Sequence, residues 1–348
     1  MKKKDERTLV ILNYAMDSKN PIFSHQIEAV NNLSIFFSKV VVVTSHAGDY
    51  HVGDNVIVRP SHWVNGRPLR NMINFLRAIV PELKKNSVVF SHMTDVQSAI
   101  IGPLTKFLGI KHYLWYAHAS LSPYLRWSHF WVSSILTSTA GSCPINSPKV
   151  NIVGQAINPE IFFFKTDLTQ KLISGIHIGR FDPPKRIDLI IEECIKIRLM
   201  GYQISLTQIG NPSGPQFSEY QNAILQNAKR DNHDKWLIFQ ESIPRDHLPS
   251  ILQEMDFFIH AFDGSLDKTL IEATMCGLPV LTTNAEYLRE FGTWTGELTS
   301  TLSDQFNCIY KMERAEFVKE LFRRRVLCLE KHSSIHWQKE VSRLLLSS

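Results

Sequence analysis

Short apolar runs alternate with longer amphipathic stretches along almost the whole chain, and this alternation constrains the fold more than any other feature. The apolar runs of the first half include TLVILNY, KVVVVTS, SVVFSHM, KHYLWYAH and SILTST. Between them lie stretches with helical spacing, such as SHQIEAVNNLSIFFSK and PLRNMINFLRAIVPELKK. Strands that are apolar on both faces and are separated by helices predict a parallel sheet with helices on both sides.

The same pattern starts again in the second half, with the runs SGIHIGRF, QISLTQIG, WLIFQES, DFFIHAF and PVLTT. We therefore predict an α/β protein with two Rossmann-like, doubly wound domains that face a central cleft. The expected ranges are 1–160 for the N-terminal domain, 161–330 for the C-terminal domain, and 331–348 for a terminal helix that packs back on the N-terminal domain. A length of 348 residues is large for one hydrophobic core and agrees with two domains.

The distribution of charge and of cysteines indicates which partners and which kinds of stabilising site the chain can have. Residues 1–165 contain 17 Lys and Arg against 9 Asp and Glu, a net charge of +8. This excess indicates either an anionic partner or a plain solvated face. The five cysteines are scattered without a CxxC pair, which argues against a disulfide framework or a zinc cluster. No apolar run reaches the ~18 residues that span a bilayer. We expect a cytoplasmic protein, with peripheral contact to the cytosolic membrane face as an option.

The stretch HIGRFDPPKRID, from His177 to Asp188, concentrates cations at the end of an expected strand. Arg180 follows the strand, and Lys185 and Arg186 precede the next helix. Anions bind at the carboxyl ends of strands in such folds, where Arg supplies two parallel donors and Lys a compact charge. We predict that Arg180 and Lys185 bind an anion, whereas Arg186 alone fits a surface charge at a helix start.

The stretch DGSLDKTLIEATMCGLPVLTTN places polar residues at the start of another helix, near Asp267. The first N–H groups of a helix have no internal partners and carry partial positive charge, which suits a phosphate. Gly264 and Ser265 allow a ligand to come close, and Asp267 fits the N-cap. Glu272, one turn further on, can accept hydrogen bonds from vicinal hydroxyls such as those of a ribose, unless it is simply solvated.

These two motifs, GRFDPPKRIDLII and LDKTLIEATMCGLPVLTT, resemble the C-terminal domain of the retaining GT-B glycosyltransferases of family GT4, the glycosyl transferases group 1. The order of motifs agrees over most of the chain, and VGQAINPEIF resembles the interdomain segment of that family. The resemblance implies that Arg180 and Lys185 bind the diphosphate of a nucleotide sugar and that Glu272 binds its ribose. The implied donor-binding residues are Arg180, Lys185, Asp263, Gly264, Ser265, Asp267, Lys268, Thr269 and Glu272.

One position departs from the family. The first Glu of its spaced Glu pair, which commonly binds the donor sugar, corresponds to Gly264. The departure leaves the identity of the sugar open, and the loop Asp263–Lys268 is then expected to contact it.

The N-terminal half matches the family more loosely. The family's sugar-contacting or catalytic histidine corresponds to His118, at the end of the run KHYLWYAH. Ser24, His25 and His92 are further possible contacts to sugar or phosphate. Each of the three histidines also fits a hydrogen-bonded core residue. Together with Arg180 and Lys185, His118 completes the expected catalytic set.

The resemblance implies a hexosyltransferase that retains the anomeric configuration and acts on a hydroxyl of a glycan or lipid-linked acceptor, as in polysaccharide biosynthesis. Arg180, Lys185 and the helix start would stabilise the leaving diphosphate, so neither a metal nor a cofactor other than the donor is expected. The aromatic-rich residues 112–136 fit either core or a surface against an anionic membrane. A nucleic-acid-modifying glycosyltransferase and a non-catalytic GT-B scaffold are the alternatives, and no motif supports nucleic acid.

Overall fold

The computed structural model describes residues 4–20, 23–168 and 170–347, and it divides into two compact units. Unit 1 consists of residues 1–156 and 335–348, and unit 2 of residues 157–334. Each of these limits lies four residues from the boundaries expected at 160 and 330. The outermost expected ranges include residues 1–3, 21, 22 and 348, which lie outside the described residues.

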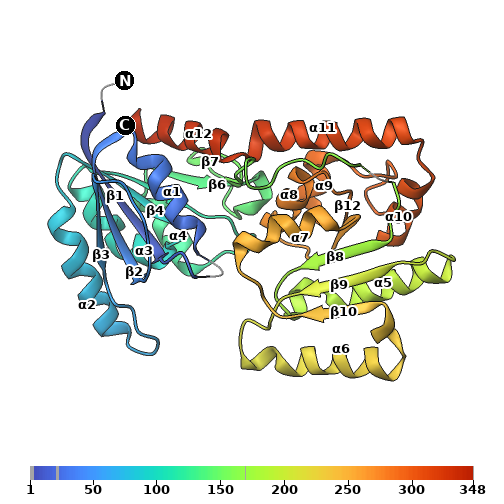
Figure 1. Ribbon diagram of the computed structural model, residues 1–348. Coiled ribbons are helices and arrows are strands. Elements are labelled where there is room, and N and C mark those ends of the chain that lie inside the picture. The colour runs from blue at the N-terminus through green and yellow to red at the C-terminus, as the bar shows by residue number, and fades with distance from the viewer. Residues whose placement is uncertain (1–3, 21–22, 169, 348) are drawn as a thin grey trace. The chain divides into compact units, whose positions relative to one another are not determined.

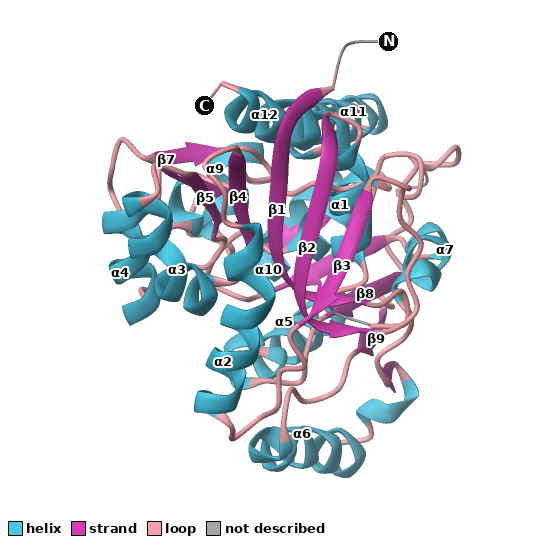
Figure 2. Cartoon of the chain, turned by 90° about the vertical axis from the view of Figure 1, so that its left-hand side faces the viewer, coloured by secondary structure: helices cyan, strands magenta, loops and turns pink. Residues whose placement is uncertain are grey.

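Unit 1 is built on a parallel seven-stranded sheet in the order β3-β2-β1-β4-β5-β6-β7 (Figures 1 and 2). Its strands are β1 (Asp5–Met16), β2 (Phe37–Ala47), β3 (Val56–Pro60), β4 (Ser87–His92), β5 (Lys111–Trp115), β6 (Ser134–Thr137) and β7 (Val150–Ile152). Its helices are α1 (His25–Ser34), α2 (Pro68–Ile79), α3 (Asp95–Phe107), α4 (Pro123–Trp131) and α12 (Ser334–Leu346). The strand order reverses beside β1, which places the switch point of the sheet between β1 and β4.

Alternate side chains of these strands fill two cores, one on each face of the sheet. Leu9, Phe90 and Trp115 pack with Trp337 of α12 and with α1 on one face. Val10 and Val89 pack with α2 and α3 on the other face. Leu125 of α4 packs against Leu114 and Ile135, which lie on that same face by strand register. The helices α2, α3 and α4 therefore form one layer, and α1 and α12 form the opposite one.

Unit 2 repeats this architecture on a smaller scale, with a parallel five-stranded sheet in the order β10-β9-β8-β11-β12. Its strands are β8 (Ser174–Ile178), β9 (Ser205–Ile209), β10 (Leu237–Gln240), β11 (Phe257–His260) and β12 (Val280–Thr282). Its helices are α5 (Ile187–Leu199), α6 (Ser218–Arg230), α7 (Leu248–Glu254), α8 (Lys268–Met275), α9 (Ala285–Phe291), α10 (Leu302–Lys311) and α11 (Arg314–His332). The switch point lies between β8 and β11. The predicted α/β class with two doubly wound domains is confirmed.

Several element boundaries differ from the sequence pattern, as two examples show. The helix expected over residues 24–39 ends at Ser34, because Phe37 is fully buried as the start of β2 and the Asn55 amide donates to the carbonyls of Ser34 and Phe37. The strand expected to end at His118 ends at Trp115, so His118 lies in the loop that follows.

The described residues contain no helix that is both long and apolar enough to cross a bilayer. Within the same ranges no group of three or more His, Cys, Asp or Glu side chains has the arrangement of a metal site. All five cysteines are free thiols, and four of them are buried.

Acid is expected to weaken unit 1 through His112. Its buried ring contacts the hydroxyls of Ser91 (2.7 Å), Ser98 (3.2 Å) and Thr105 (3.3 Å), and burial lowers its pKa to about 3. The unfolded chain binds a proton at about pH 6.5. Between these two values the unfolded state holds more protons, so the free energy of unfolding decreases as the pH is lowered, by up to ~1.4 kcal/mol per pH unit.

Urea unfolding at a series of pH values between about 7 and about 4 measures this slope. His112→Gln should lower the slope, whereas His51→Gln, a change of an exposed histidine, should leave it as in the wild type. Equal slopes for all three proteins would contradict the assignment.

Candidate functional site

The two motifs singled out in the sequence meet at the switch point of unit 2. After β8 the chain forms a short 3₁₀ turn, η3 (Pro183–Lys185), and the Lys185 ammonium forms an ion pair with the Asp267 carboxylate. The same ammonium lies 4.3 Å from the centroid of the Phe262 ring, which holds a cation by its π face. Segments that are 82 residues apart in sequence thus share one charge pair at the carboxyl edge of the sheet.

Asp267 occupies the N-cap position of α8, but its side chain makes no capping hydrogen bond. The carboxylate faces Lys185 instead, and its Oδ2 lies 3.3 Å from Nε2 of His260. Burial alone would raise the pKa of Asp267, yet the Lys185 charge and the hydrogen bond from His260 hold it well below its usual range. The cap expected from sequence gives way to the ion pair, because a partly buried carboxylate gains more from a cation than the helix start gains from a cap. The first N–H groups of α8 therefore receive no capping bond from Asp267.

Two buried histidines lie behind this ion pair. Nδ1 of His177 lies 2.9 Å from the carbonyl of Ile259, and the ring of His260 lies 5.9 Å from that of His177, centroid to centroid. Burial lowers the pKa of His177 to about 3 and also lowers that of His260, so both rings are neutral near pH 7. A Cβ on Gly179 would lie 2.8 Å from Nε2 of His177, so the strand end requires glycine here. The local charge consequently comes from Lys185, Asp267 and Arg180.

Arg180 is exposed and follows directly after Gly179. Its Nε lies 3.3 Å from Asp182 Oδ2, and the other oxygen of Asp182 accepts from the backbone N–H of Ser213. A solvated guanidinium with one such partner keeps other donors for an anion. Gly179 lies beside both cations. It directly precedes Arg180, and a Cβ added to it would lie 3.6 Å from Cδ of Lys185. The structure therefore brings Arg180 and Lys185 to the same strand end.

Glu272 lies in the second turn of α8, where it is almost completely buried. Its Oε1 accepts a hydrogen bond from Arg245, which belongs to a second 3₁₀ turn, η6 (Arg245–His247), after β10. Among the described residues, Oε2 of Glu272 and Oγ1 of Thr269 are buried without a hydrogen-bond partner. Buried polar atoms in native structures are nearly always satisfied, so these two atoms need a partner such as an ordered water or a bound molecule.

Arg245 was missed by the sequence analysis. It lies 27 residues before Glu272 in the stretch ESIPRDH, which carries no motif of its own. Its signal was the position of a cation just beyond a strand, the same signal that marked Arg180. The guanidinium also lies 5.9 Å from the ring of Phe162.

The loop between β11 and α8 accounts for the departure at Gly264. A Cβ on Gly264 would lie 2.2 Å from Cζ of Phe262, so any larger residue must displace the ring that holds Lys185. Asp263 is exposed, Ser265 is buried, and Lys268 is partly buried at the start of α8. A Glu at position 264 and the present position of Phe262 therefore exclude each other sterically.

Asn284 fixes this loop and was also missed by the sequence analysis. Its buried side chain caps α9 by accepting from the N–H of Tyr287 at 3.0 Å. Its amide nitrogen donates to the carbonyls of Phe262 (2.9 Å), Gly264 (3.3 Å) and Ser265 (3.3 Å). One side chain thus turns three loop carbonyls toward the interior. Its sequence signal was weak, because an Asn after a strand is ordinary at any helix start.

The remaining predicted residues lie in unit 1. Ser24 precedes α1 and makes no capping bond with its side chain, and His25 begins the helix. His92 ends β4 and is buried beside Phe90, Trp115 and Trp337, with its ring 6.1 Å from that of His25. His25 and His92 therefore meet at the switch point of the first sheet. His118 is exposed, with its ring 5.8 Å from that of Tyr116, and its functional role stays a prediction.

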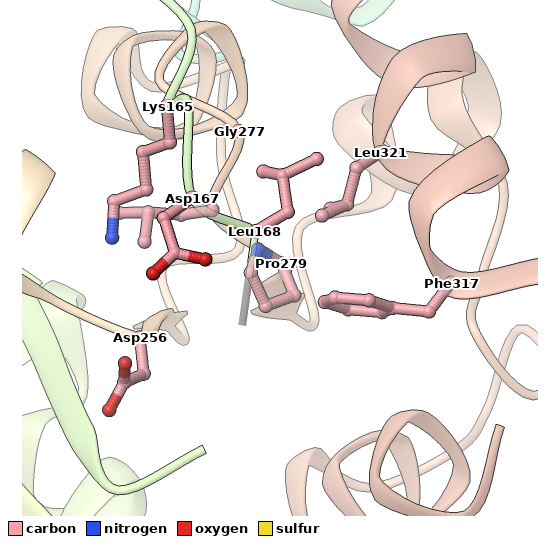
Figure 3. A pocket seen from close by; sticks show the side chains of 9 residues that line it. Lys165, Asp167, Leu168, Asp256, Gly277, Pro279, Phe317 and Leu321 are labelled. Carbon is pink, nitrogen blue, oxygen red and sulfur yellow. The ribbon is translucent and has the colours of Figure 1, made fainter. Parts of the chain in front are cut away.

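Unit 2 has a small hollow at the opposite ends of its strands from the candidate site (Figure 3). Lys165, Asp256 and Pro279 line it, and its cavity volume is about 10 Å³, the space of one water. The Lys165 ammonium donates to the carbonyl of Met255, and Asp256 accepts from the N–H groups of Ile173 and Ser174. Because these charges are used to hold the strand starts together, we leave this hollow out of the candidate site.

Comparison with known proteins finds a protein family whose model matches part of this chain. Residues 174–302 match the model of the family described as glycosyl transferases group 1, and this range contains both motifs of the candidate site. No curated protein sequence matches the chain.

Solved structures show the same fold over the whole chain. HepE from Anabaena, in complex with UDP and glucose, is 12% identical with a TM-score of 0.75, over 99% of this chain and 100% of HepE. Sucrose-phosphate synthase from Thermosynechococcus elongatus is 12% identical with a TM-score of 0.76, over 98% and 99% of the two chains. A glycosyltransferase from Rickettsia africae is 11% identical with a TM-score of 0.72, over 98% and 99%.

The role of Asn284 can be tested with two substitutions. Asn284→Ala removes the α9 cap and all three donated bonds, and should lower the free energy of unfolding by ~2–4 kcal/mol. Asn284→Asp keeps an acceptor for the cap but places a carboxylate against three carbonyl oxygens, and should cost ~1–3 kcal/mol. Urea unfolding measures both losses. An Asp variant as stable as the wild type would show that the donated bonds do not hold the loop.

Proposed function

We propose that this chain, a group 1 glycosyltransferase of the GT-B type, transfers a hexose from a nucleoside diphosphate sugar to a hydroxyl of a glycan or lipid-linked acceptor, with retention of the anomeric configuration. The observation that carries the proposal is the start of α8. There a buried carboxylate with an unused oxygen, Glu272, lies one turn beyond a buried unused hydroxyl, Thr269, beside the Lys185–Asp267 pair. A ligand with hydroxyls and phosphates satisfies all of these groups at once.

In this proposal the diphosphate lies at the edge formed by Arg180, Lys185 and the first turn of α8. Arg180 is solvated and lies next to Lys185 along the strand end. The N-terminus of α8 adds the positive end of a helix dipole. Together these groups stabilise the negative charge that develops on the leaving diphosphate. Because this charge is offset by protein groups, the proposed reaction uses no metal and no cofactor other than the donor.

Glu272 binds the ribose in this proposal. Its Oε1 is held by Arg245, so its Oε2 is the oxygen that accepts from the ribose hydroxyls. The loop Asp263–Lys268 then faces the sugar, with Asp263 as its exposed carboxylate. HepE in its complexes binds UDP and glucose, which makes UDP-glucose the first donor to test.

The proposed acceptor side lies in unit 1, where His118 would contact the sugar or the reacting groups. Retention follows from attack on the face that the leaving group vacates. A phosphate oxygen of that leaving group then takes the proton from the acceptor hydroxyl. The O–H bond of the acceptor and the bond from the anomeric carbon to the diphosphate break, and a new glycosidic bond forms. The nucleoside diphosphate leaves with the proton.

The experiment compares donor binding and turnover in two variants of the diphosphate site. Isothermal titration with UDP-, GDP- and ADP-sugars first identifies the donor. Arg180→Ala and Lys185→Ala should then weaken nucleoside diphosphate binding by ~1.5–3 kcal/mol each, as for charge-assisted hydrogen bonds. Arg230→Ala, a change of an exposed arginine on α6, is the matched control and should bind as the wild type does.

Unchanged nucleoside diphosphate affinity in both variants would refute the diphosphate assignment. A wild-type protein that binds a donor but hydrolyses or transfers none, with any acceptor tested, would instead support the non-catalytic scaffold.

A further inference from the structure

The positive charge of the first half of the sequence belongs to one part of unit 1. Residues 1–54 contain six Lys and Arg and six Asp and Glu, so they are neutral overall. Residues 55–149 contain ten Lys and Arg against two Asp and Glu, a net charge of +8. This segment runs from the start of β3 to the start of β7, and it contains the whole layer formed by α2, α3 and α4.

Neither acid of this segment is left as an exposed charge. Glu82 is buried and pairs with Arg59 at 2.7 Å, and Asp95 accepts from the hydroxyl of Ser122 at 2.5 Å. Exposed cations lie on each helix of the layer or at its end, namely Arg67, Arg70, Arg77, Lys106 and Arg126. The outer side of α2, α3 and α4, which we call the α2–α4 face, therefore carries an excess of positive charge.

The same face exposes large apolar side chains. On α2 the side chains of Leu69, Met72 and Ile73 are exposed, while Asn71, Phe75 and Ile79 form the buried stripe. On α4 the exposed residues are Tyr124, Trp127 and Phe130, at a spacing of three residues, and Phe130 is 64% exposed. Phe107, at the end of α3, is 87% exposed. Exposed apolar side chains gathered on one face mark an interaction surface.

The aromatic-rich residues 112–136 divide between core and surface. Tyr113, Trp115 and Tyr116 are buried, so the core alternative holds for these three. They lie on or beside β5, whose two faces are both covered. The three exposed aromatic residues all lie on α4, and they fit the surface alternative.

We propose that the α2–α4 face binds the surface of an anionic lipid bilayer. Tyr and Trp rings settle at the level of the lipid headgroups, where apolar and polar surroundings meet. Arg and Lys beside them are attracted by anionic headgroups, and their aliphatic stems cover apolar surface. Helices that lie flat with apolar residues and arginines on one side have the composition of interfacial helices.

A nucleic acid fits this surface less well. Single strands bind in positively charged grooves, where bases stack on aromatic rings along the backbone path. The α2–α4 face consists of outward-facing helix surfaces, and it exposes the aliphatic Leu69, Met72 and Ile73, on which no base stacks. Aliphatic side chains gain contact with acyl chains instead. Charge and apolar exposure together therefore favour a bilayer.

Co-sedimentation with vesicles tests this proposal on the full-length protein. The wild type should sediment with vesicles of equal parts phosphatidylglycerol and phosphatidylcholine at about 0.1 M salt, and less at about 0.5 M salt, because the attraction is screened. It should sediment much less with phosphatidylcholine alone. Trp127→Ala with Phe130→Ala, and separately Arg70→Gln with Arg77→Gln, should each lower the partition coefficient roughly tenfold.

The control changes exposed apolar residues on the opposite layer of the same unit. Ile35→Ala with Ile335→Ala alters the groove beside α12 and should bind vesicles as the wild type does. Trp127→Ala removes the hydrogen bond from Trp127 Nε1 to the Ala99 carbonyl and could disturb the packing of α3 with α4. The variant with Arg70→Gln and Arg77→Gln keeps this bond, so it tests the face independently.

Three results would overturn the proposal. One is absence of vesicle binding by the wild type at low salt, and another is an equal loss in the control variant. The third is displacement of the protein from the vesicles by a single-stranded oligonucleotide whose binding is lost in the same variants. That result would assign the face to nucleic acid. Nucleotide affinity, measured on the same variants, should stay unchanged, so that this test and that of the donor site are independent.

Discussion

The ion pair between Lys185 and Asp267 is the interaction on which the rest of the candidate site depends. It joins the segment after β8 to the segment before α8 across the switch point of the second sheet. It also directs the Asp267 side chain away from the helix start. Phe262 lies against the ammonium, and the position of its ring in turn requires glycine at position 264. Together with the hydrogen bonds from Asn284, this charge pair holds the loop that would face the donor sugar.

A second pair, Arg245–Glu272, repeats the arrangement one turn further along α8. In both pairs the carboxylate belongs to α8 or its first flanking residue, and the cation comes from a short turn after another strand. A buried carboxylate without its cation costs ~3–5 kcal/mol. Each pair therefore contributes to the stability of the fold as well as to the proposed binding site. The difference lies in what remains unused: Asp267 is shared by Lys185 and His260, whereas Glu272 keeps one oxygen without a partner among the described residues.

The sequence predicted the class of fold and the strands of both halves, because buried parallel strands read as apolar runs whatever surrounds them. It also predicted that Lys185 and α8 lie at strand ends, since parallel strands bring such loops to one edge. It did not predict Arg245 or Asn284, whose roles depend on which distant atoms their side chains reach. It missed α9, α10 and α11, which lie between the last expected strand and the terminal helix. The side-chain choice of Asp267 between a cap and an ion pair is likewise decided by tertiary contacts alone.

The position of the ribose is the most direct test of the account, because it depends on the one unused oxygen of Glu272. The measurement is the affinity of the best-bound nucleoside diphosphate relative to its 2′,3′-dideoxy analogue, by isothermal titration. The wild type should favour the ribonucleotide by ~1.5–3 kcal/mol, as for hydrogen bonds to a charged group. Glu272→Gln should lose most of this preference, as should Arg245→Met, whereas Arg230→Ala should keep it. A wild type that binds both nucleotides equally, or a Glu272→Gln variant with the full preference, would contradict the assignment of the ribose to α8.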